Sequence, residues 1–173
     1  MSNNAITLRL ARPDDAVFLE KWDLDPDVIA SHGAEMQDDT IWRDEDWRAE
    51  IAAAHVWRRI LIAEKEGRPV SVIVDIDPAL EVSHYWGDCG GNFRAFDIWV
   101  GEAADRGRGI GAAMMRLAAA QAFADPRVNA ILIDPLLSNT RAHRFYERAG
   151  FRAVEERTFG SDACLVMRLD RPR

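Results

Sequence analysis

Cysteine is scarce in this chain of 173 residues, which contains only Cys89 and Cys164. The two do not form a CxxC pair, and no cluster of histidines lies beside either of them. The sequence therefore predicts neither a disulfide framework nor a zinc site, and we expect both thiols to be free. The four histidines have no metal-ligand spacing either, so we expect no bound metal.

Long apolar runs are also missing. No uninterrupted run approaches the ~18 residues needed to span a bilayer, and the amino-terminal MSNNAITLRL lacks the basic and apolar regions of a secretory signal. We therefore expect a cytoplasmic protein with no membrane partner. Low-complexity stretches, internal repeats and linkers are absent as well, and 48% of the residues are hydrophobic. The expectation is a single domain over residues 1–173.

Positive charge is scarce in the first part of the chain but not in the second. Residues 1–105 contain 22 acidic and 10 basic residues, whereas residues 106–173 contain 7 acidic and 12 basic ones. The net charge of −7 argues against a nucleic-acid partner, because neutralising phosphates needs a basic surface. The division favours an anionic ligand bound by the second part and a cationic ligand attracted by the first. A solvated acidic surface that only aids solubility explains most of the carboxylates equally well.

Hydrophobic periodicity predicts a mixed α/β fold. The predicted elements are a strand at 6–10, a helix beginning near 13, a helix within 44–55, a hairpin at 56–77, a strand at 93–100, a helix after 109, a strand at 129–134, a helix at 139–150 and a closing strand pair at 151–169. Residues 23–46 favour short helix and loop, as in a lid that faces a substrate, and residues 78–92 favour a loop. The order predicts a partly parallel sheet with an antiparallel amino-terminal part.

The segment DRGRGIG, residues 105–111, predicts a phosphate-binding turn. Its three glycines lack Cβ atoms, so the backbone can turn sharply and direct several N–H groups at one anion. The helix that follows adds its free amino-terminal N–H groups and the positive end of its dipole. Two arginines supply guanidinium groups suited to phosphate oxygens. A mobile turn with its arginines in water is the alternative.

The same residues satisfy the dinucleotide fingerprint G-x-G-x-x-G/A through Gly107, Gly109 and Ala112. That motif belongs near the start of a fold that has a second βαβ half behind it. Here the loop begins well past the middle of the chain, and the helix after it leaves too few residues for such a half. The position therefore disfavours a nicotinamide or flavin cofactor.

Two motifs resemble the GNAT-type N-acetyltransferases. RGRGIG, at 106–111, lies between a predicted strand and a predicted helix and is similar to the family's acetyl-CoA loop, Q/R-x-x-G-x-G/A. DPLLSNTRAHRFYERAGF, at 134–151, is similar to the family's segment N-x-R-A…Y-x-x-x-G-F. The resemblance is good over residues 93–155 and looser before them. It implies a single-domain GNAT fold, with a mixed central sheet, an antiparallel amino-terminal part, splayed parallel strands and flanking helices.

The resemblance also implies acetyl-CoA as co-substrate, without a metal. The residues implied to hold its diphosphate are Arg106, Gly107, Arg108, Gly109, Ile110 and Gly111, and those implied to lie along its pantetheine arm are Ile98, Trp99 and Val100. The arm would pass between the two splayed strands, and Pro135, which cannot donate to a strand ladder, fits a place where pairing fails. Asn139 would contact the coenzyme, although it could equally cap the helix that follows it.

Asp97 and Tyr146 are the candidate catalytic residues. Strand alternation places Asp97 on the same face as Trp99, and a carboxylate there needs a reason, because Asp is depleted in strands and costly to bury unpaired. Facing the acceptor, it could bind an ammonium group and accept its proton. A structural Asp paired with Arg94 or with a loop N–H is the alternative. For Tyr146, the resemblance implies the general acid near the coenzyme A sulfur, and a core tyrosine is the alternative.

Within the superfamily, FDIWVGE at 96–102 and the segment 134–151 are most similar to the aminoglycoside 6'-N-acetyltransferases. This resemblance implies that Asp97 and Asp134 contact an aminosugar, and we place Trp86 beside them as an acceptor-binding residue. The expected function is acetylation of a primary amine on a small cationic acceptor, most specifically the 6'-amine of an aminoglycoside. One departure is that Ser31-His32-Gly33 stands where those enzymes tend to carry a tryptophan pair.

Other functions stay open from the sequence. The same fold could acetylate a siderophore precursor such as N6-hydroxylysine, a polyamine or a peptide amine. It could also be a regulatory module that binds acyl-CoA without catalysis. The sequence does not distinguish a monomer from a homodimer.

Overall fold

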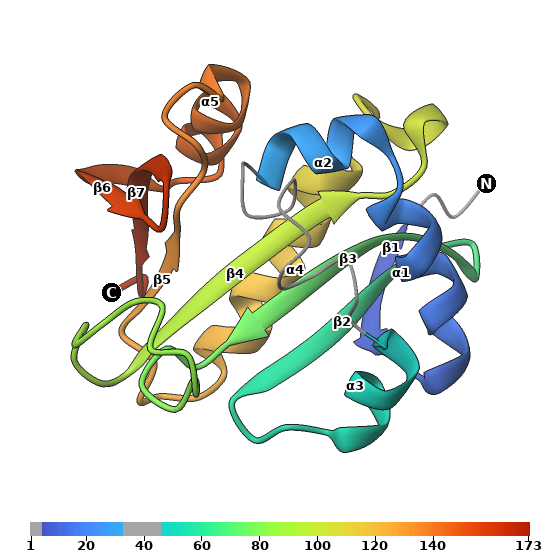
Figure 1. Ribbon diagram of the computed structural model, residues 1–173, viewed down its shortest axis with the longest axis horizontal. Helices are drawn as coiled ribbons and strands as arrows, with labels where there is room; N and C mark the ends of the chain where they lie inside the picture. Colours follow the sequence, from blue (N-terminus) through green and yellow to red (C-terminus); the bar gives the residue numbers. More distant parts are fainter. Residues whose placement is uncertain (1–4, 33–45) are drawn as a thin grey trace.

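A seven-stranded sheet runs through the molecule in the order β1-β2-β3-β4-β5-β7-β6 (Figure 1). The computed structural model describes residues 5–32 and 46–173. The strands are β1 (Ile6–Leu10), β2 (Arg58–Lys65), β3 (Arg68–Ile76), β4 (Phe93–Val100), β5 (Ala130–Ile133), β6 (Arg152–Phe159) and β7 (Asp162–Asp170). Neighbouring strands are antiparallel except β4 and β5, which are parallel. The predicted mixed sheet with an antiparallel amino-terminal part is confirmed.

Helices cover both faces of this sheet. They are α1 (Ala16–Asp23), α2 (Pro26–His32), α3 (Trp47–Ala53), α4 (Ile110–Phe123) and α5 (Thr140–Arg148). The first three pack on one face, where Leu19, Trp22 and Trp47 are buried in one apolar core. The last two pack on the opposite face over a second core that contains Met114 and Tyr146, and Figure 1 shows α4 behind the central strands.

Strand alternation decides which side chains of β4 enter which core. Trp99 lies in the core under α1–α3, and Phe96 lies in the core under α4 and α5. Asp97, which the sequence predicted to share a face with Trp99, therefore faces the side of α1–α3. One face of β4 thus carries the candidate base Asp97, and its other face lines the core under α4 and α5.

The parallel strands β4 and β5 separate after a short contact. They pair only where residues 93–95 of β4 meet residues 130–132 of β5, and Figure 1 shows them diverging beyond that point. Beyond Ile133 the chain stays with β7, since the Leu165 N–H donates to the Pro135 carbonyl at 2.9 Å and the Leu137 N–H to the Ala163 carbonyl at 2.7 Å. Residues 96–100 consequently have no strand partner on the β5 side within the described ranges. The predicted splay is confirmed.

Two stretches differ from the sequence-based expectation in extent. The helix predicted within 44–55 is confined to α3, and Asp46 caps it by accepting from the Ala49 N–H at 3.0 Å. The stretch 23–46, which was expected to resemble a lid, contains α2. Its residues 33–45, including Gly33, lie outside the described residues. Residues 78–92 contain no helix or strand, in agreement with the predicted loop. None of the described helices is long and apolar enough to cross a membrane.

Candidate active site

A cavity of about 1430 Å³ opens where β4 leaves β5. Its walls come from α2, the end of β4, the loop before α4, and the facing sides of α4 and α5. The residues expected from the sequence that line it are Ile98, Trp99, Val100, Arg106, Gly107, Gly109, Gly111, Asn139 and Tyr146. The expected residues that do not line it are Asp97, Arg108, Ile110, Asp134 and Trp86. The structure thus places most of the expected coenzyme residues on one cavity and the expected acceptor carboxylates outside it.

The turn that opens α4 has the backbone of an anion cradle. Gly107 and Gly109 adopt left-handed conformations, with φ of 73° and 79°, which glycine adopts without the strain that a Cβ would cause. Gly109 is the N-cap of α4 and offers no side chain to it. Within the described part of the chain, none of the N–H groups of residues 107–112 donates a hydrogen bond. Free N–H groups at a helix amino terminus favour an anion.

The guanidinium group of Arg106 is engaged elsewhere. It contacts Asp25 at 2.9 Å and Asp27 at 2.6 Å, and it donates to the carbonyls of Val100 at 3.1 Å and Gly101 at 3.0 Å. The sequence predicted this group as a phosphate ligand, but in the structure it ties α2 to the end of β4. The loop therefore offers backbone N–H groups to the cavity, and the Arg106 side chain holds the loop in place.

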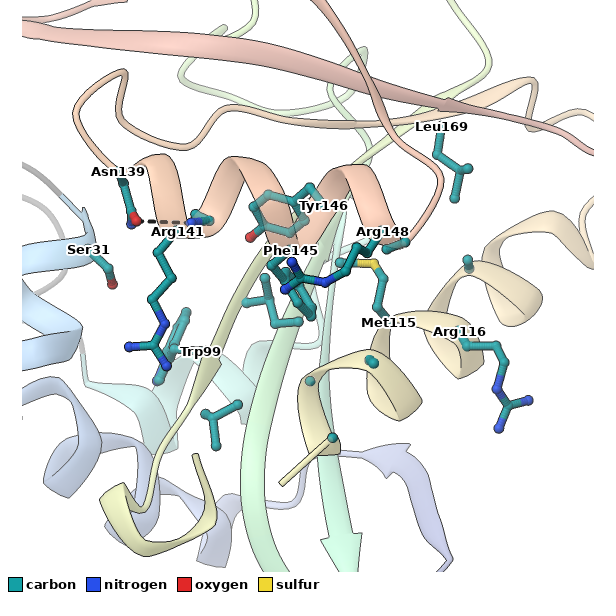
Figure 2. A pocket seen from close by; sticks show the side chains of 18 of the residues that line it. Ser31, Trp99, Met115, Arg116, Asn139, Arg141, Phe145, Tyr146, Arg148 and Leu169 are labelled. Atoms are coloured by element: carbon teal, nitrogen blue, oxygen red, sulfur yellow. Dashed lines mark hydrogen bonds between the residues drawn. The ribbon is translucent and has the colours of Figure 1, made fainter. Parts of the chain in front are cut away.

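Three arginines that the sequence reasoning did not select supply positive charge to the cavity. Figure 2 shows Arg141 and Arg148 extending from α5, and Arg116 from α4. None of them forms an ion pair among the described residues, unlike Arg106. Arg171 also lines the cavity, but it donates to the carbonyls of Phe123 and Val128 at 2.8 Å each. Helical spacing could have indicated that Arg141 and Arg148 share one face of α5, because their positions are two turns apart.

Asp97 has the environment of a base. The alternative in which it pairs with Arg94 is excluded, because Arg94 donates instead to Asp75 at 2.6 Å. The Asp97 carboxylate forms no hydrogen bond or ion pair within residues 5–32 and 46–173. Burial and then the charge of Glu81 raise the pKa of Asp97 to about 6, while Arg58 opposes them. Such a carboxylate is mostly ionised at pH 7 but binds a proton more strongly than an ordinary Asp.

Tyr146 lies both in the core and on the cavity. Its side chain is 8% exposed, and its ring packs edge-on against Phe145 and Phe151, with centroid distances of 5.1 and 5.7 Å (Figure 2). Burial raises the pKa of its hydroxyl, and the charges of Asp97 and Asp134 raise it further. The hydroxyl therefore keeps its proton, and two carboxylates act on it from nearby.

A second tyrosine, which the sequence reasoning did not assign to the site, holds Asp134. The Tyr85 hydroxyl donates to the Asp134 carboxylate at 2.6 Å, and its ring stacks on Phe159 at 4.4 Å. Burial raises the Tyr85 pKa most, and Asp134 and Asp97 add to the shift. The charges of Asp97 and Asp134 thus raise the pKa of both tyrosines. Trp86 is 4% exposed in the same aromatic cluster, so its contact with an acceptor stays a prediction.

Two buried polar atoms lack a hydrogen-bond partner in the described part of the chain, namely the Trp99 Nε1 and the Glu81 Oε2. Such atoms are rare in folded proteins and call for an explanation. Trp99 lines the cavity and packs edge-on against His32 at 5.0 Å, and the charge of Glu81 acts on Asp97. The unpaired donor thus lies on the α1–α3 side of β4, and the unpaired acceptor belongs to the glutamate whose charge acts on Asp97.

Asn139 caps α5, as one reading of the sequence predicted. Its Oδ1 accepts from the Ala142 N–H at 3.1 Å (Figure 2). Because Asn139 also lines the cavity, a contact with a ligand through its remaining amide group stays a prediction. No group of three potential metal ligands occurs among the residues that the structure describes.

Comparisons with known proteins agree with this geometry. Residues 12–159 match the family model described as an acetyltransferase (GNAT) domain. Aminoglycoside N(6')-acetyltransferase type 1 of Klebsiella pneumoniae is 28% identical over 161 residues, which cover 87% of this chain and 75% of that protein. The crystal structure of the aminoglycoside acetyltransferase AAC(6')-Ib with coenzyme A superposes with a TM-score of 0.82 at 26% identity, covering 96% of this chain and 95% of the other.

The same enzyme in complex with ribostamycin and coenzyme A gives a TM-score of 0.83 at 25% identity, over 96% of this chain and 94% of the other. The family model spans most of the sequence, and its boundaries include the cavity loop, the β4–β5 splay and α5. The chain therefore belongs to the GNAT acetyltransferase family and is an acyltransferase.

Proposed function

We propose that this chain transfers the acetyl group of acetyl-CoA to a primary amine of a small polycation, and that the acceptor is the 6'-amine of an aminoglycoside. One observation carries the proposal. The cradle of free N–H groups opens onto the unpaired edge of β4, and Asp97 belongs to that same unpaired stretch, on the face that also carries the cavity residue Trp99. Donor and acceptor can therefore meet where β4 separates from β5.

The donor side fits acetyl-CoA. The free N–H groups of residues 107–112 and the dipole of α4 suit the diphosphate. The edge of β4 over residues 96–100 offers backbone groups that no neighbouring strand uses, and a pantetheine arm with amide groups can pair with such an edge. Acetyl-CoA supplies the thioester that the amine attacks.

Asp97 and Tyr146 have complementary roles in this proposal. The ionised Asp97 carboxylate accepts a proton from the ammonium group, directly or through water, so that the amine nitrogen can attack the thioester carbonyl. As the carbon–sulfur bond breaks, the Tyr146 hydroxyl donates its proton to the departing thiolate. The nitrogen loses its second proton as the amide forms, and this proton restores the Tyr146 hydroxyl, while Asp97 returns the first proton to solvent.

The acceptor side fits a polycation. The charge of Glu81 raises the pKa of Asp97, and Arg58 is the cation that opposes this shift. The charges of Asp97 and Asp134 raise the pKa of the same two tyrosines. An excess of carboxylates attracts and orients a ligand that carries several ammonium groups. The names of the relatives support an aminoglycoside, since structure neighbours were solved with ribostamycin and with kanamycin. The cytoplasmic location stays a prediction.

An acceptor screen tests the proposal. The protein is incubated with acetyl-CoA and with aminoglycosides, spermidine, N6-hydroxylysine or a peptide amine, and free thiol release is measured. We expect an aminoglycoside with a 6'-amine to give the fastest release, and its 6'-deoxy or 6'-hydroxy analogue to give none above hydrolysis. Preference for another amine would replace the acceptor but keep the reaction.

Two variants separate an enzyme from a regulatory module that only binds the coenzyme. Asp97→Asn and Tyr146→Phe should both retain acetyl-CoA binding by calorimetry. Each should lower kcat by about 100-fold or more, in the range of a lost general acid or base. Unchanged turnover in both variants contradicts the assigned roles, and absence of turnover in every arm with intact binding favours the regulatory module.

A further inference from the structure

Trp99 carries a polar atom that the proposed acetyl transfer does not yet use. Its side chain is 6% exposed, and its Nε1–H donates to no group in the described part of the chain. A buried donor without a partner costs free energy, because water can no longer bond to it. The residue also lines the cavity (Figure 2). A ligand that enters the cavity can therefore supply the missing partner.

The indole of Trp99 is held from several directions. His32 packs edge-on against it with a centroid distance of 5.0 Å, and the ring of Trp47 packs on it at 6.4 Å. The backbone carbonyl of Trp99 accepts from the hydroxyl of Ser71, which is fully buried. A donor fixed in this way needs little reorganisation when negative charge develops beside it.

Trp47, in the same core, shows the contrasting case of a structural indole. Its side chain is 1% exposed, and its Nε1–H donates to the Asp23 carboxylate. Both rings belong to the core under α1–α3. One indole N–H of this pair therefore stabilises the fold, whereas that of Trp99 has no structural bond among the residues that the structure describes.

Trp99 lies beside the candidate base. It follows Asp97 by two residues on the same face of β4, which separates their Cα atoms by about 6.6 Å, and both belong to the stretch that has no partner on the β5 side. When an amine attacks a thioester, the base binds the nitrogen, and the carbonyl oxygen two bonds away gains negative charge. Two hydrogen bonds of about 2.9 Å, joined through nitrogen, carbon and oxygen, span a gap of this size.

We propose that the Trp99 Nε1–H donates a hydrogen bond to the thioester carbonyl oxygen and stabilises the negative charge that this oxygen gains as the amine attacks. The inference rests on the proposed acetyl transfer but not on the identity of the acceptor. The carbon–oxygen double bond opens as the nitrogen–carbon bond forms, and it closes again as the carbon–sulfur bond breaks and Tyr146 protonates the thiolate. Trp99 keeps its proton throughout, because an indole N–H only donates. Catalytic hydrogen bonds often close only when the substrate is bound.

Trp99→Phe and Trp47→Phe form a matched pair, because each removes one indole N–H and the same number of ring atoms from one core. Both are measured by urea unfolding, by calorimetry with acetyl-CoA, and by thiol release with the best acceptor of the screen. Trp99→Phe should lower kcat by about 100-fold, the effect of losing one oxyanion donor. Its KM values and its affinity for acetyl-CoA should not change, because the bond is strong only in the transition state.

The control should give the opposite pattern. Trp47→Phe should keep kcat and should lose more unfolding free energy than Trp99→Phe, because it removes a hydrogen bond from the buried Asp23 carboxylate. The fall of kcat/KM at low pH should keep its midpoint in Trp99→Phe, since Asp97 remains the base.

Several results overturn the inference. An unchanged kcat in Trp99→Phe does so, and a raised KM for the acceptor with kcat retained would place the N–H against the acceptor instead. A loss of stability in Trp99→Phe as large as in Trp47→Phe would give the N–H a structural role. A moved pH midpoint would mean that Trp99 acts through Asp97 and not on the carbonyl oxygen. Absence of turnover in the natural chain with every amine contradicts the proposed function itself.

Discussion

At position 97, catalysis and stability make opposite demands on one carboxylate. Partial burial and the nearby charge of Glu81 raise the pKa of Asp97 to about 6. The raised value makes the carboxylate a stronger base near neutral pH. It also means that the folded chain holds an ionised group less favourably than water does. Both consequences can be measured.

The first is a pH dependence. Protonated Asp97 cannot accept the ammonium proton, so kcat/KM for the acceptor should fall as the pH decreases through about 6. Glu81→Gln should move this fall to lower pH, because the Glu81 charge is one cause of the raised pKa. The control Glu20→Gln changes an exposed glutamate on α1 and should leave the profile in place. A fall centred near pH 4 in the natural chain, or no movement in Glu81→Gln, contradicts this account.

The second is a stability change in Asp97→Asn. A carboxylate whose pKa is raised from 3.8 to about 6 destabilises the fold above pH 6 and has no such effect below pH 3.8. Asparagine lacks this penalty. Two pKa units correspond to at most about 3 kcal/mol, and partial exposure to solvent lowers the expected gain to about 1–2 kcal/mol. Urea unfolding should therefore show a more stable variant at pH 8 and a gain about a third as large at pH 4.5. An equal gain at both pH values points to packing instead.

At the scale of elements, the turn before α4 depends on backbone conformation more than on side chains. Gly109 has a φ of +79°, and a Cβ on it would meet no atom within 4 Å. Gly67, in the β2–β3 hairpin, has a φ of +78° and equally open surroundings. The two positions therefore differ in location but hardly in local strain.

Because the two glycines have the same local conformation, Gly67 serves as a control position for Gly109. Gly109→Ala and Gly67→Ala should each lose about 1 kcal/mol of unfolding free energy, because alanine is strained at such φ values. Only Gly109→Ala should raise KM for acetyl-CoA, about tenfold, since relieving its strain turns the loop N–H groups away from the diphosphate. The readouts are chemical unfolding and donor titration at saturating acceptor. An equal KM for both variants would remove the loop from the donor site.

Local patterns in the sequence explain why the elements were predictable. The alternation in 93–100, the glycines before α4 and the Asn139 cap are each set by neighbours a few residues away. Side-chain contacts between elements far apart in the sequence could not be predicted in this way. Arg106 looked like a phosphate ligand because its partners Asp25 and Asp27 lie 81 and 79 positions earlier, on α2 or just before it.

The candidate-site residues show the same difference: local patterns place some of them, and contacts between distant parts of the chain place the others. Asp97 and Tyr146 could be selected because strand alternation and a recognisable motif place them. Tyr85 could not, since its role depends on Asp134, 49 residues later in the chain. Arg148 and Arg144 are both exposed cations on one helix, and only the orientation of α5 in the fold decides that the former lines the cavity.

Over the whole molecule, the uneven charge of the sequence becomes two sides of one site. Among the described residues, the five arginines that line the cavity all belong to residues 106–173. On the acceptor side, Asp97 and Glu81 belong to residues 1–105, and Asp134 joins them from the second part of the chain. Folding therefore places an anion-binding wall next to a cation-attracting wall, and the two meet at the unpaired stretch of β4.

This arrangement predicts how salt affects catalysis. Attraction between an acidic surface and a polycation acts over a Debye length, which shrinks from about 30 Å at 0.01 M salt to about 10 Å at 0.1 M. Across this range KM for an acceptor with four amines should rise several-fold, and KM for a monoamine analogue should change less than about twofold. The kcat of both should stay constant, because the proton transfers to Asp97 and from Tyr146 occur within contact distance. A KM for the tetra-amine that does not depend on salt would mean that the carboxylates of residues 1–105 other than Asp97 serve solubility alone. The acceptor would then have to be recognised by Asp97, Asp134 and the aromatic cluster through direct contact.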